Sequence, residues 1–345
     1  MAYSEQITTT VTDIPALIAA FAAARGWSVS GTTITRPGGG KSFEITASIG
    51  GTNNRDHLVY VKDTAAPTAN YVWTAMPWFN GVYTNPVVQT PTKVHLLGND
   101  AVGSPAVYDP EPWIACVIEC GYNLYRHIYI GNVVKAGNYT GGELISANMF
   151  NRDVRFAGAG GTDSYGDDTT MWNPYHRYLF SARWTGSGLP AGAGTGGVNV
   201  VHADNDYPFR RFDGPSAYTA QTAFDGTSVI GGASDNVGAG LVAKGLSDYA
   251  GSNILVPVNL FIPDSDLIGV DVKFRPIGYA AGVRMINMSG INPGDAIVIG
   301  SKTWRAFAEF SRQTETTMPY GTSNPDGFYY PYETSYMIGL AYEEA

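Results

Sequence analysis

The chain has 345 residues, of which 42 are Gly, 20 are Pro and only 15% carry a charge. This composition predicts a turn-rich globular protein and argues against a mostly helical, disordered or collagen-like chain. A formal net charge of -9 argues against nucleic acid as a partner, and the two cysteines are too few for a disulfide framework.

The first 65 residues contain a helix signal followed by strand signals. Apolar residues recur at helical spacing from residue 14 to residue 21, with Asp13 as the expected N-cap, Pro15 in the first turn and Gly26 as the stop. Alternating apolar and polar residues then predict strands at 27–30, 43–49 and 58–61. We therefore expect a small α+β docking domain at 1–65, and a Pro-containing linker begins the second domain, 66–345.

The apolar stretch 14–24 is the main candidate for a targeting or membrane segment. It is too short to span a bilayer, which takes about 20 apolar residues. Glu5 and Asp13 precede it and no Lys or Arg does, which is not typical of a secretory signal peptide. We expect a soluble protein that is neither inserted into a membrane nor exported by this route.

From residue 70 onward the pattern is almost entirely that of β-structure. The predicted strands are 114–118, 127–130, 254–261, 270–274, 296–299 and 336–342. Pro293-Gly294-Asp295 is a turn signal, because Pro presets the first turn angle and Gly accepts a positive one. The Gly-rich stretches 157–168 and 185–197 are predicted long loops. The expected fold is mainly β, with an antiparallel sandwich or barrel-like body.

Motifs that could bind a cofactor or a metal have simpler structural explanations. Gly38-Gly39-Gly40-Lys41-Ser42 lacks the first Gly of a phosphate-binding loop and precedes a strand, so a hairpin turn is expected. Cys116 and Cys120 lie four apart in a strand and are expected in the core. The five histidines do not have the spacing of metal ligands. His127 alternates with apolar residues in a predicted strand, so we expect it to be a hydrogen-bonded residue in the wall of the fold and not a metal ligand. We expect no cofactor and no metal.

Signals for catalysis rest on composition alone. The Gly-x-Ser-x-Gly pattern of a nucleophile elbow is absent from the sequence. Sugar cleavage needs two facing carboxylates, and the candidates are Glu111, Glu119, Asp167, Asp168, Asp204 and Asp206. Solvated turn residues are the default interpretation of the four aspartates. We expect no enzymatic activity.

Aromatic clusters are the richest feature of the sequence, with 22 Tyr and 7 Trp. Tyr and Trp combine a large apolar area with one polar tip, which suits protein interfaces and sugar stacking alike. Burial in the core is the equally weighted alternative. The candidate interface or glycan contacts are Tyr71, Trp73, Trp78, Phe79, Trp172, Tyr175, Tyr178 and Trp184.

Three regions of the chain contain short motifs whose order and spacing are informative. The first comprises 14–18 (IPALI), 24–29 (ARGWSV) and 43–45 (FEI); the second is 126–131 (RHIYIG); the third comprises 292–300 (NPGDAIVIG) and 302–307 (KTWRAF). Together they resemble structural proteins of tailed-bacteriophage virions. In those proteins a short helix ends in Gly-Trp before a hairpin, and the ending reads G-D-x-I-x-I-G-x-x-x-W-x-x-F-P. Here Ala308 replaces the final Pro.

The resemblance implies a non-enzymatic virion component, assembled in the host cytoplasm and placed in the tail or baseplate region. Its partners would be other virion structural proteins and further copies of itself, as a trimer or a hexameric ring. Aromatic-rich surfaces and flexible Gly-rich loops would make the contacts. One alternative is a module that binds or cleaves a bacterial surface polysaccharide, and another is a capsid decoration protein.

Overall fold

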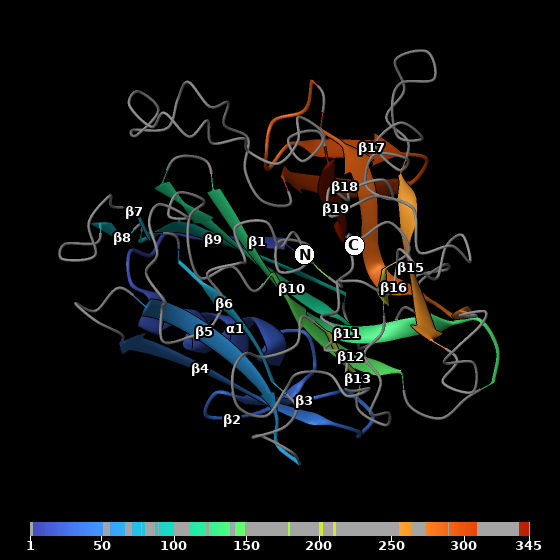
Figure 1. Cartoon of the computed structure of the whole chain (residues 1–345), viewed down its shortest axis with the longest axis horizontal. Helices are drawn as coiled ribbons and strands as arrows, with labels where there is room; N and C mark the ends of the chain where they lie inside the picture. The colour runs from blue at the N-terminus through green and yellow to red at the C-terminus, as the bar shows by residue number, and fades with distance from the viewer. Residues whose placement is uncertain are drawn as a thin grey trace, which may run out of the picture.

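The protein has a mainly β fold with one short helix near the N-terminus, and its antiparallel sheets curl into a half-barrel (Figure 1). The predicted fold class is therefore confirmed. The computed structural model describes residues 3–50, 56–65, 71–76, 78–79, 87–88, 90–99, 111–121, 124–138, 142–148, 179, 200–202, 210–211, 255–263, 274–288, 290–308 and 338–344. The predicted loops 157–168 and 185–197 lie outside these residues.

The N-terminal part forms a short helix and a 5-stranded antiparallel sheet, ordered β2-β3-β4-β5-β6 within the described residues. Its helical elements are η1 (Val11–Asp13) and α1 (Ile14–Ala23). Its strands are β2 (Ser28–Ser30), β3 (Thr33–Thr35), β4 (Ser42–Gly50), β5 (Asp56–Asp63) and β6 (Tyr71–Ala75). Each strand predicted in this part is present, and β4 and β5 are longer than predicted.

The residues predicted to begin and end α1 are Asp13 and Gly26. Gly26 ends the helix in the left-handed conformation, with φ 80°, as predicted. Asp13 is the N-cap residue, as predicted, but its side chain makes no capping hydrogen bond. The 3-10 turn η1 leads directly into α1, and the Asp13 carboxylate instead accepts a hydrogen bond from the Thr8 hydroxyl at 3.0 Å.

The described strands of the body join β1 (Tyr3–Gln6) in a 12-stranded antiparallel sheet. Its main path is β1-β9-β10-β11-β16-β19-β18-β17, with β12 and β13 attached at β11 and β14 and β15 at β16. The bounds are β9 (Pro91–Gly98), β10 (Ile114–Cys120), β11 (Leu124–Lys135), β12 (Glu143–Ala147), β13 (Val200–His202), β14 (Arg210–Arg211), β15 (Val256–Pro263), β16 (Phe274–Asn287), β17 (Ala296–Ile299), β18 (Lys302–Ala308) and β19 (Ile338–Glu344). A separate pair consists of β7 (Trp78–Phe79) and β8 (Val87–Val88).

The strand predictions for the body hold with shifted ends. The predicted strand 254–261 appears as β15, and the predicted strand 336–342 appears as β19, each two residues further along the chain. Most of the predicted strand 270–274 lies outside the described residues, and Phe274 begins β16. β11 is much longer than the 127–130 prediction, because apolar residues continue through Val133 and Val134.

Strand β10 is buried on both faces and separates two hydrophobic cores. One core contains Ile114 and Ile118 of β10 together with Ile18 of α1 and Ile45 of β4. The other contains Val117 of β10 with aromatic and aliphatic residues of β11, β16, β18 and β19. The first core thus joins residues on both sides of the domain boundary placed at residue 65. That boundary stays a prediction.

Strand β16 bends closely around an aromatic ring. Gly282 has φ 65°, and an added Cβ atom would overlap the indole of Trp113. Trp113 is 1% exposed and its ring stacks on that of Tyr129, with centroids 6.4 Å apart. Only Gly satisfies both the backbone angle and the close approach at this position.

Candidate functional site

The predicted aromatic contacts fall into two groups. Tyr71 and Trp73 lie in β6, and the backbone of Trp78 and Phe79 forms β7. Trp73 is half-buried. The other predicted contacts lie outside the described residues, and they are Trp172, Tyr175, Tyr178 and Trp184. Their role stays a prediction.

Trp73 belongs to a half-buried face of the five-stranded sheet. It lies directly opposite Tyr60 of β5, while Val61 and Val72, the next residues, point into the core. The ammonium of Lys62 lies 5.6 Å from the centroid of the Tyr60 ring. We call Tyr60, Lys62 and Trp73 the outer aromatic face. It presents ring surface beside a cation, which suits a protein contact or a sugar.

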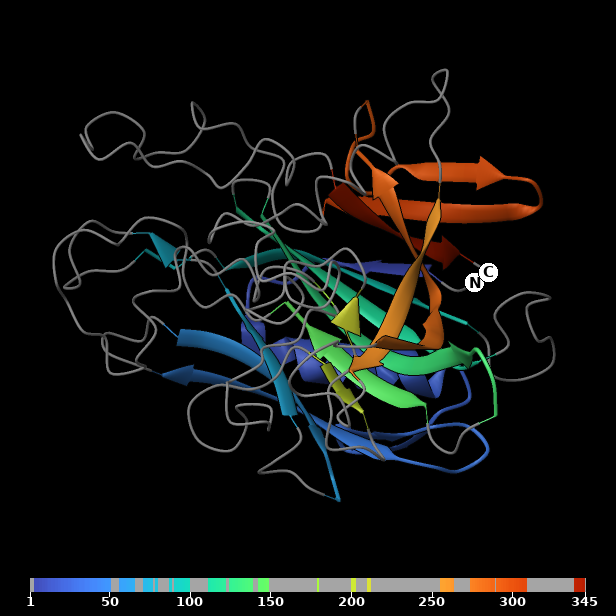
Figure 2. The ribbon, with the colours of Figure 1, turned by 45° about the vertical axis from the view of Figure 1, so that its right-hand side comes forward.

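Strand β17 of the β17–β18 hairpin is the most exposed apolar strand among the described residues. Val298 is 70% exposed and Ile299 is 42% exposed, and both lie in β17. Among the described strands, β17 pairs only with β18, so it is an edge of the large sheet. The hairpin projects from the upper right of the molecule in Figure 2. Exposed apolar edge strands are sites of association with other chains.

The predicted turn before β17 is confirmed. The Asp295 amide donates to the Asn292 carbonyl at 3.0 Å, and Gly294 takes φ 88°, as the Pro-Gly-Asp signal requires. Arg305 of β18 fixes the turn from the other side by donating to the Gly294 carbonyl at 2.8 Å. The same guanidinium binds the Glu344 carboxylate of β19 at 2.8 Å. The hairpin is therefore held in a defined position at the sheet edge.

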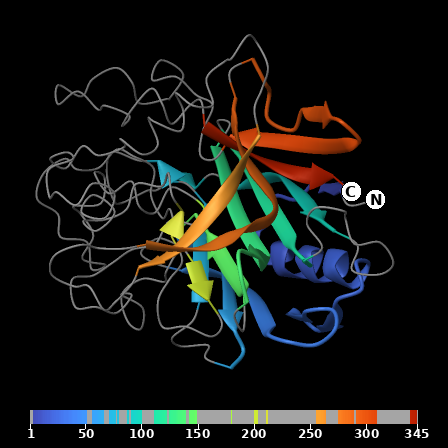
Figure 3. The ribbon, with the colours of Figure 1, turned by 90° about the vertical axis from the view of Figure 1, so that its right-hand side faces the viewer.

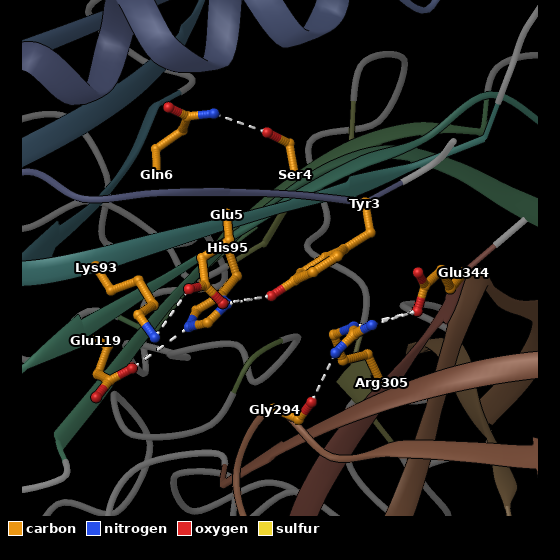
Figure 4. A network of polar contacts seen from close by, with 10 residues as sticks. All are labelled: Tyr3, Ser4, Glu5, Gln6, Lys93, His95, Glu119, Gly294, Arg305 and Glu344. Atoms are coloured by element: carbon orange, nitrogen blue, oxygen red, sulfur yellow. Dashed lines mark hydrogen bonds and ion pairs between the residues drawn. The ribbon is translucent and has the colours of Figure 1, made fainter.

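A polar network lies where β1, β9 and β10 meet (Figure 4). His95 is only 3% exposed, and both of its ring nitrogens face oxygen atoms. Its Nδ1 lies 2.9 Å from the Tyr3 hydroxyl, and its Nε2 lies 3.4 Å from Glu119 Oε2. Glu5 accepts from the Tyr3 hydroxyl at 2.9 Å and forms an ion pair with Lys93, also at 2.9 Å. The network ties the first strand of the sequence to its neighbours.

The charges of this network shift one another's pKa. The hydrogen bond from Lys93 lowers the pKa of Glu5, and the pKa of Lys93 is raised by the same contact. The hydrogen bond with His95 lowers the pKa of Glu119. Burial, followed by the contact with Glu5, raises the pKa of the Tyr3 hydroxyl well above its usual range. Both carboxylates are thus stabilised in the ionised form.

Arg305 extends this region to the β17–β18 hairpin. Its guanidinium carbon lies 3.9 Å from the centroid of the Tyr3 ring, on the side away from His95 in Figure 4. A cation held over an aromatic face in this way is attracted by the ring quadrupole. Contacts from β1 therefore reach both β9 and the far end of the large sheet, which curls back toward its first strand.

The catalytic carboxylate candidates are not brought together where the structure describes them. Glu111 accepts from Arg36 at 2.6 Å and from Asn132 at 2.8 Å, next to the start of β10. Glu119 lies near the other end of β10, beside His95. The four candidate aspartates, Asp167, Asp168, Asp204 and Asp206, lie outside the described residues. No group of three His, Cys, Asp or Glu in the described part of the chain could hold a metal ion.

Three other motifs have the structural roles predicted for them. His127 is fully buried, with Nδ1 2.8 Å from the Tyr342 hydroxyl and Nε2 2.9 Å from the Ala308 carbonyl. Cys116 and Cys120 are buried and unbridged, and burial raises the pKa of Cys120 to about 12. Residues 38–41 lie in the connection between β3 and β4, with three successive positive-φ glycines, and Ser42 begins β4.

The sequence matches no protein-family model and has no significant match among curated proteins. Among the described residues, no helix combines the length and apolar content that crossing a membrane requires.

Sequence reasoning missed the two sites that the structure brings forward. The 296–299 run was predicted as a strand, but its exposure follows from its place at the sheet edge, which a strand pattern does not contain. The network around His95 joins residues 3, 5, 95 and 119, whose proximity depends on the pairing of β1 with β9. His95 and Glu119 lie 24 residues apart in the sequence, and this separation carries no spacing signal that could have revealed their contact.

Proposed function

We propose that this protein is a non-enzymatic structural component of a tailed-bacteriophage virion, in the tail or baseplate region. The resemblance of three ordered segments supports this role. Two of these segments form compact described elements, which are α1 with the strands β2 to β4, and the β17–β18 hairpin. The neighbours are other virion proteins and further copies of the chain.

The observation that carries the proposal is the exposed apolar edge at β17. Val298 is 70% exposed although it lies in an ordered strand, and Ile299 beside it is 42% exposed. An isolated soluble protein usually protects such an edge with charge, Pro or a covering segment. A subunit that is buried against neighbours in an assembly needs no such protection, because the neighbour covers the edge.

The test is to locate the protein in particles. Antibodies raised against the purified chain are applied to phage particles purified from cells that carry its gene, and electron microscopy records where gold-labelled antibody binds. We expect label at the tail or baseplate. Label over the head would instead support the capsid decoration alternative. Particles free of the protein by both labelling and mass spectrometry would overturn the proposed role.

The outer aromatic face favours a second candidate, the polysaccharide-binding module. Tyr60 and Trp73 lie side by side on adjacent strands, with Lys62 over the Tyr60 ring. If this face stacks on sugar rings, Trp73→Ala should weaken binding of the host surface polysaccharide at least tenfold, about 1.4 kcal/mol. Tyr60→Phe is the matched control, since it keeps the ring. Unchanged binding in Trp73→Ala would exclude this face as the sugar site.

A further inference from the structure

The free edge of β17 has a defined hydrogen-bonding pattern. The Ala306 amide of β18 donates to the Asp295 carbonyl at 3.0 Å. In an antiparallel pair, alternate residues direct their backbone groups toward the partner strand. The backbones of Ile297 and Ile299 therefore face β18, and the N–H and C=O groups of Ala296 and Val298 face outward. The edge of β17 that does not pair with β18 lies on the side of the hairpin away from the body (Figure 3).

We propose that β17 pairs with β17 of a second copy of this chain, antiparallel and about a two-fold axis at Ile297. In this register Ala296 of each copy lies opposite Val298 of the other. Every outward N–H and C=O of these two residues then meets a partner, and a small side chain packs beside a larger one. This interface deepens the proposed assembly role and rests on that role for its place in the virion.

The ends of β17 favour a partner strand as short as β17 itself. Pro293, which has no N–H, precedes the strand by three residues, and Gly300, with φ 63°, begins the hairpin turn after it. A longer strand would extend past the free backbone groups on both sides without finding partners. The β17 strand of a second copy has the same length, because it is the same strand.

Charge selects the antiparallel orientation. Asp295 is the only charged residue between Gly294 and Ser301, and it is exposed. A parallel pair would place the two Asp295 carboxylates next to each other, which is unfavourable. The antiparallel pair places them at opposite ends, each beside Ile299 of the other copy.

The interface is small, so its expected strength is low. A strand of four residues covers far less than the roughly 800 Å² per partner of a stable complex. We expect dimers with a dissociation constant of about 0.1–1 mM in solution, strengthened in a particle by neighbouring contacts. A two-fold contact makes even-numbered assemblies, so it would join two rings or produce dimers rather than close a trimer by itself.

Sedimentation equilibrium across a concentration series up to about 1 mM tests the association. We expect Val298→Lys to weaken dimer formation at least tenfold, because it places a charge on each side of the shared edge. Ile7→Lys is the matched control, since Ile7 is 83% exposed but lies after β1. Both variants should unfold at the wild-type temperature. Equal weakening by both variants, or by neither, would overturn the proposal.

Cross-linking tests the register and captures even weak pairing. Across a two-fold axis at Ile297, the two Cα atoms would lie about 4.5 Å apart, within disulfide range. Ile297 is partly exposed and both native cysteines are buried, so Ile297→Cys adds a more accessible thiol than either of them. We expect Ile297→Cys to form covalent dimers under mild oxidation at least tenfold faster than Ile7→Cys. Similar rates for both would overturn the register.

Failure of this inference is distinguishable from failure of the proposed function. A chain that stays monomeric and is not selectively cross-linked, yet is found in tails, refutes the β17 pairing and leaves the virion role intact. If the chain is selectively cross-linked into dimers but is absent from particles, the β17 pairing is supported and the virion role is refuted. Failure of both tests refutes both proposals.

Discussion

His95 shows how a buried polar residue is accommodated between strands. Its two ring nitrogens contact Tyr3 and Glu119, and its ring packs 4.7 Å from that of Phe307 between centroids. Buried polar groups are costly unless they are hydrogen-bonded, and here both nitrogens have oxygen partners. Through these contacts the residue links β1 to β10 across β9.

The lowered pKa of Glu119 gives stability a pH dependence. Because its pKa is lower in the folded than in the unfolded state, its contribution is present above about pH 5 and is lost as pH falls through the folded value. We expect Glu119→Gln to lower the free energy of unfolding by less than about 1 kcal/mol at pH 7, with the difference from wild type shrinking as pH falls through the lowered pKa of Glu119. Denaturant unfolding at several pH values measures this. Glu44→Gln controls for the change in net charge.

The contact between Gly282 and Trp113 predicts a large effect from one methyl group. Gly282→Ala requires a positive φ from a residue with a Cβ and displaces a buried indole. We expect a loss of about 2–4 kcal/mol in stability, measured by chemical denaturation. Gly31→Ala is the control, because φ is similar at 61° but a Cβ there has open space. Equal losses would show that the backbone angle alone decides the cost.

At the scale of elements, Arg36 links the β3–β4 hairpin to the large sheet. Its guanidinium contacts Glu111 at 2.6 Å and Glu143 at 3.3 Å, so one planar group bridges two carboxylates from distant segments. We expect Arg36→Met to reduce stability by about 1–2 kcal/mol, because the two carboxylates lose their common partner.

Arg36→Lys separates charge from geometry. Lysine keeps the positive charge but cannot present the fork that reaches both carboxylates. A loss of stability in Arg36→Lys that lies between wild type and Arg36→Met, measured by thermal unfolding, would show that the bridge geometry matters. Full retention of stability in Arg36→Lys would show that charge alone is sufficient.

Elements were predicted better than their arrangement. The residues of β4 and α1 carry their own periodicity, and the Pro-Gly-Asp turn carries its own backbone preference, so local sequence was sufficient. Asp13 occupies the predicted N-cap position, but its carboxylate accepts from the Thr8 hydroxyl instead of capping a helix N–H, a contact that the local pattern does not predict. The place of β19 between β16 and β18, and so the edge position of β17, depends on pairings across distant segments, which local patterns do not encode.

At the scale of the whole molecule, the shared core sets the expectation for truncation. Removing residues 1–65 would uncover the face of β10 that carries Ile114 and Ile118, now packed against α1 and β4. We expect the shortened chain to bind a hydrophobic dye and to lose its cooperative thermal transition. Intact β-sheet circular dichroism with a sharp transition would instead support an independent domain from residue 66 onward.

The position of β19 also has a consequence for biosynthesis. The β17–β18 hairpin joins the main sheet through β19, which is made after it and pairs with β16 on its other side. A nascent chain can form the hairpin early, but cannot fasten it to the body before β19 leaves the ribosome. Translation order thus delays the docking of the apolar edge onto the body until β19 is available to pair with both β16 and β18.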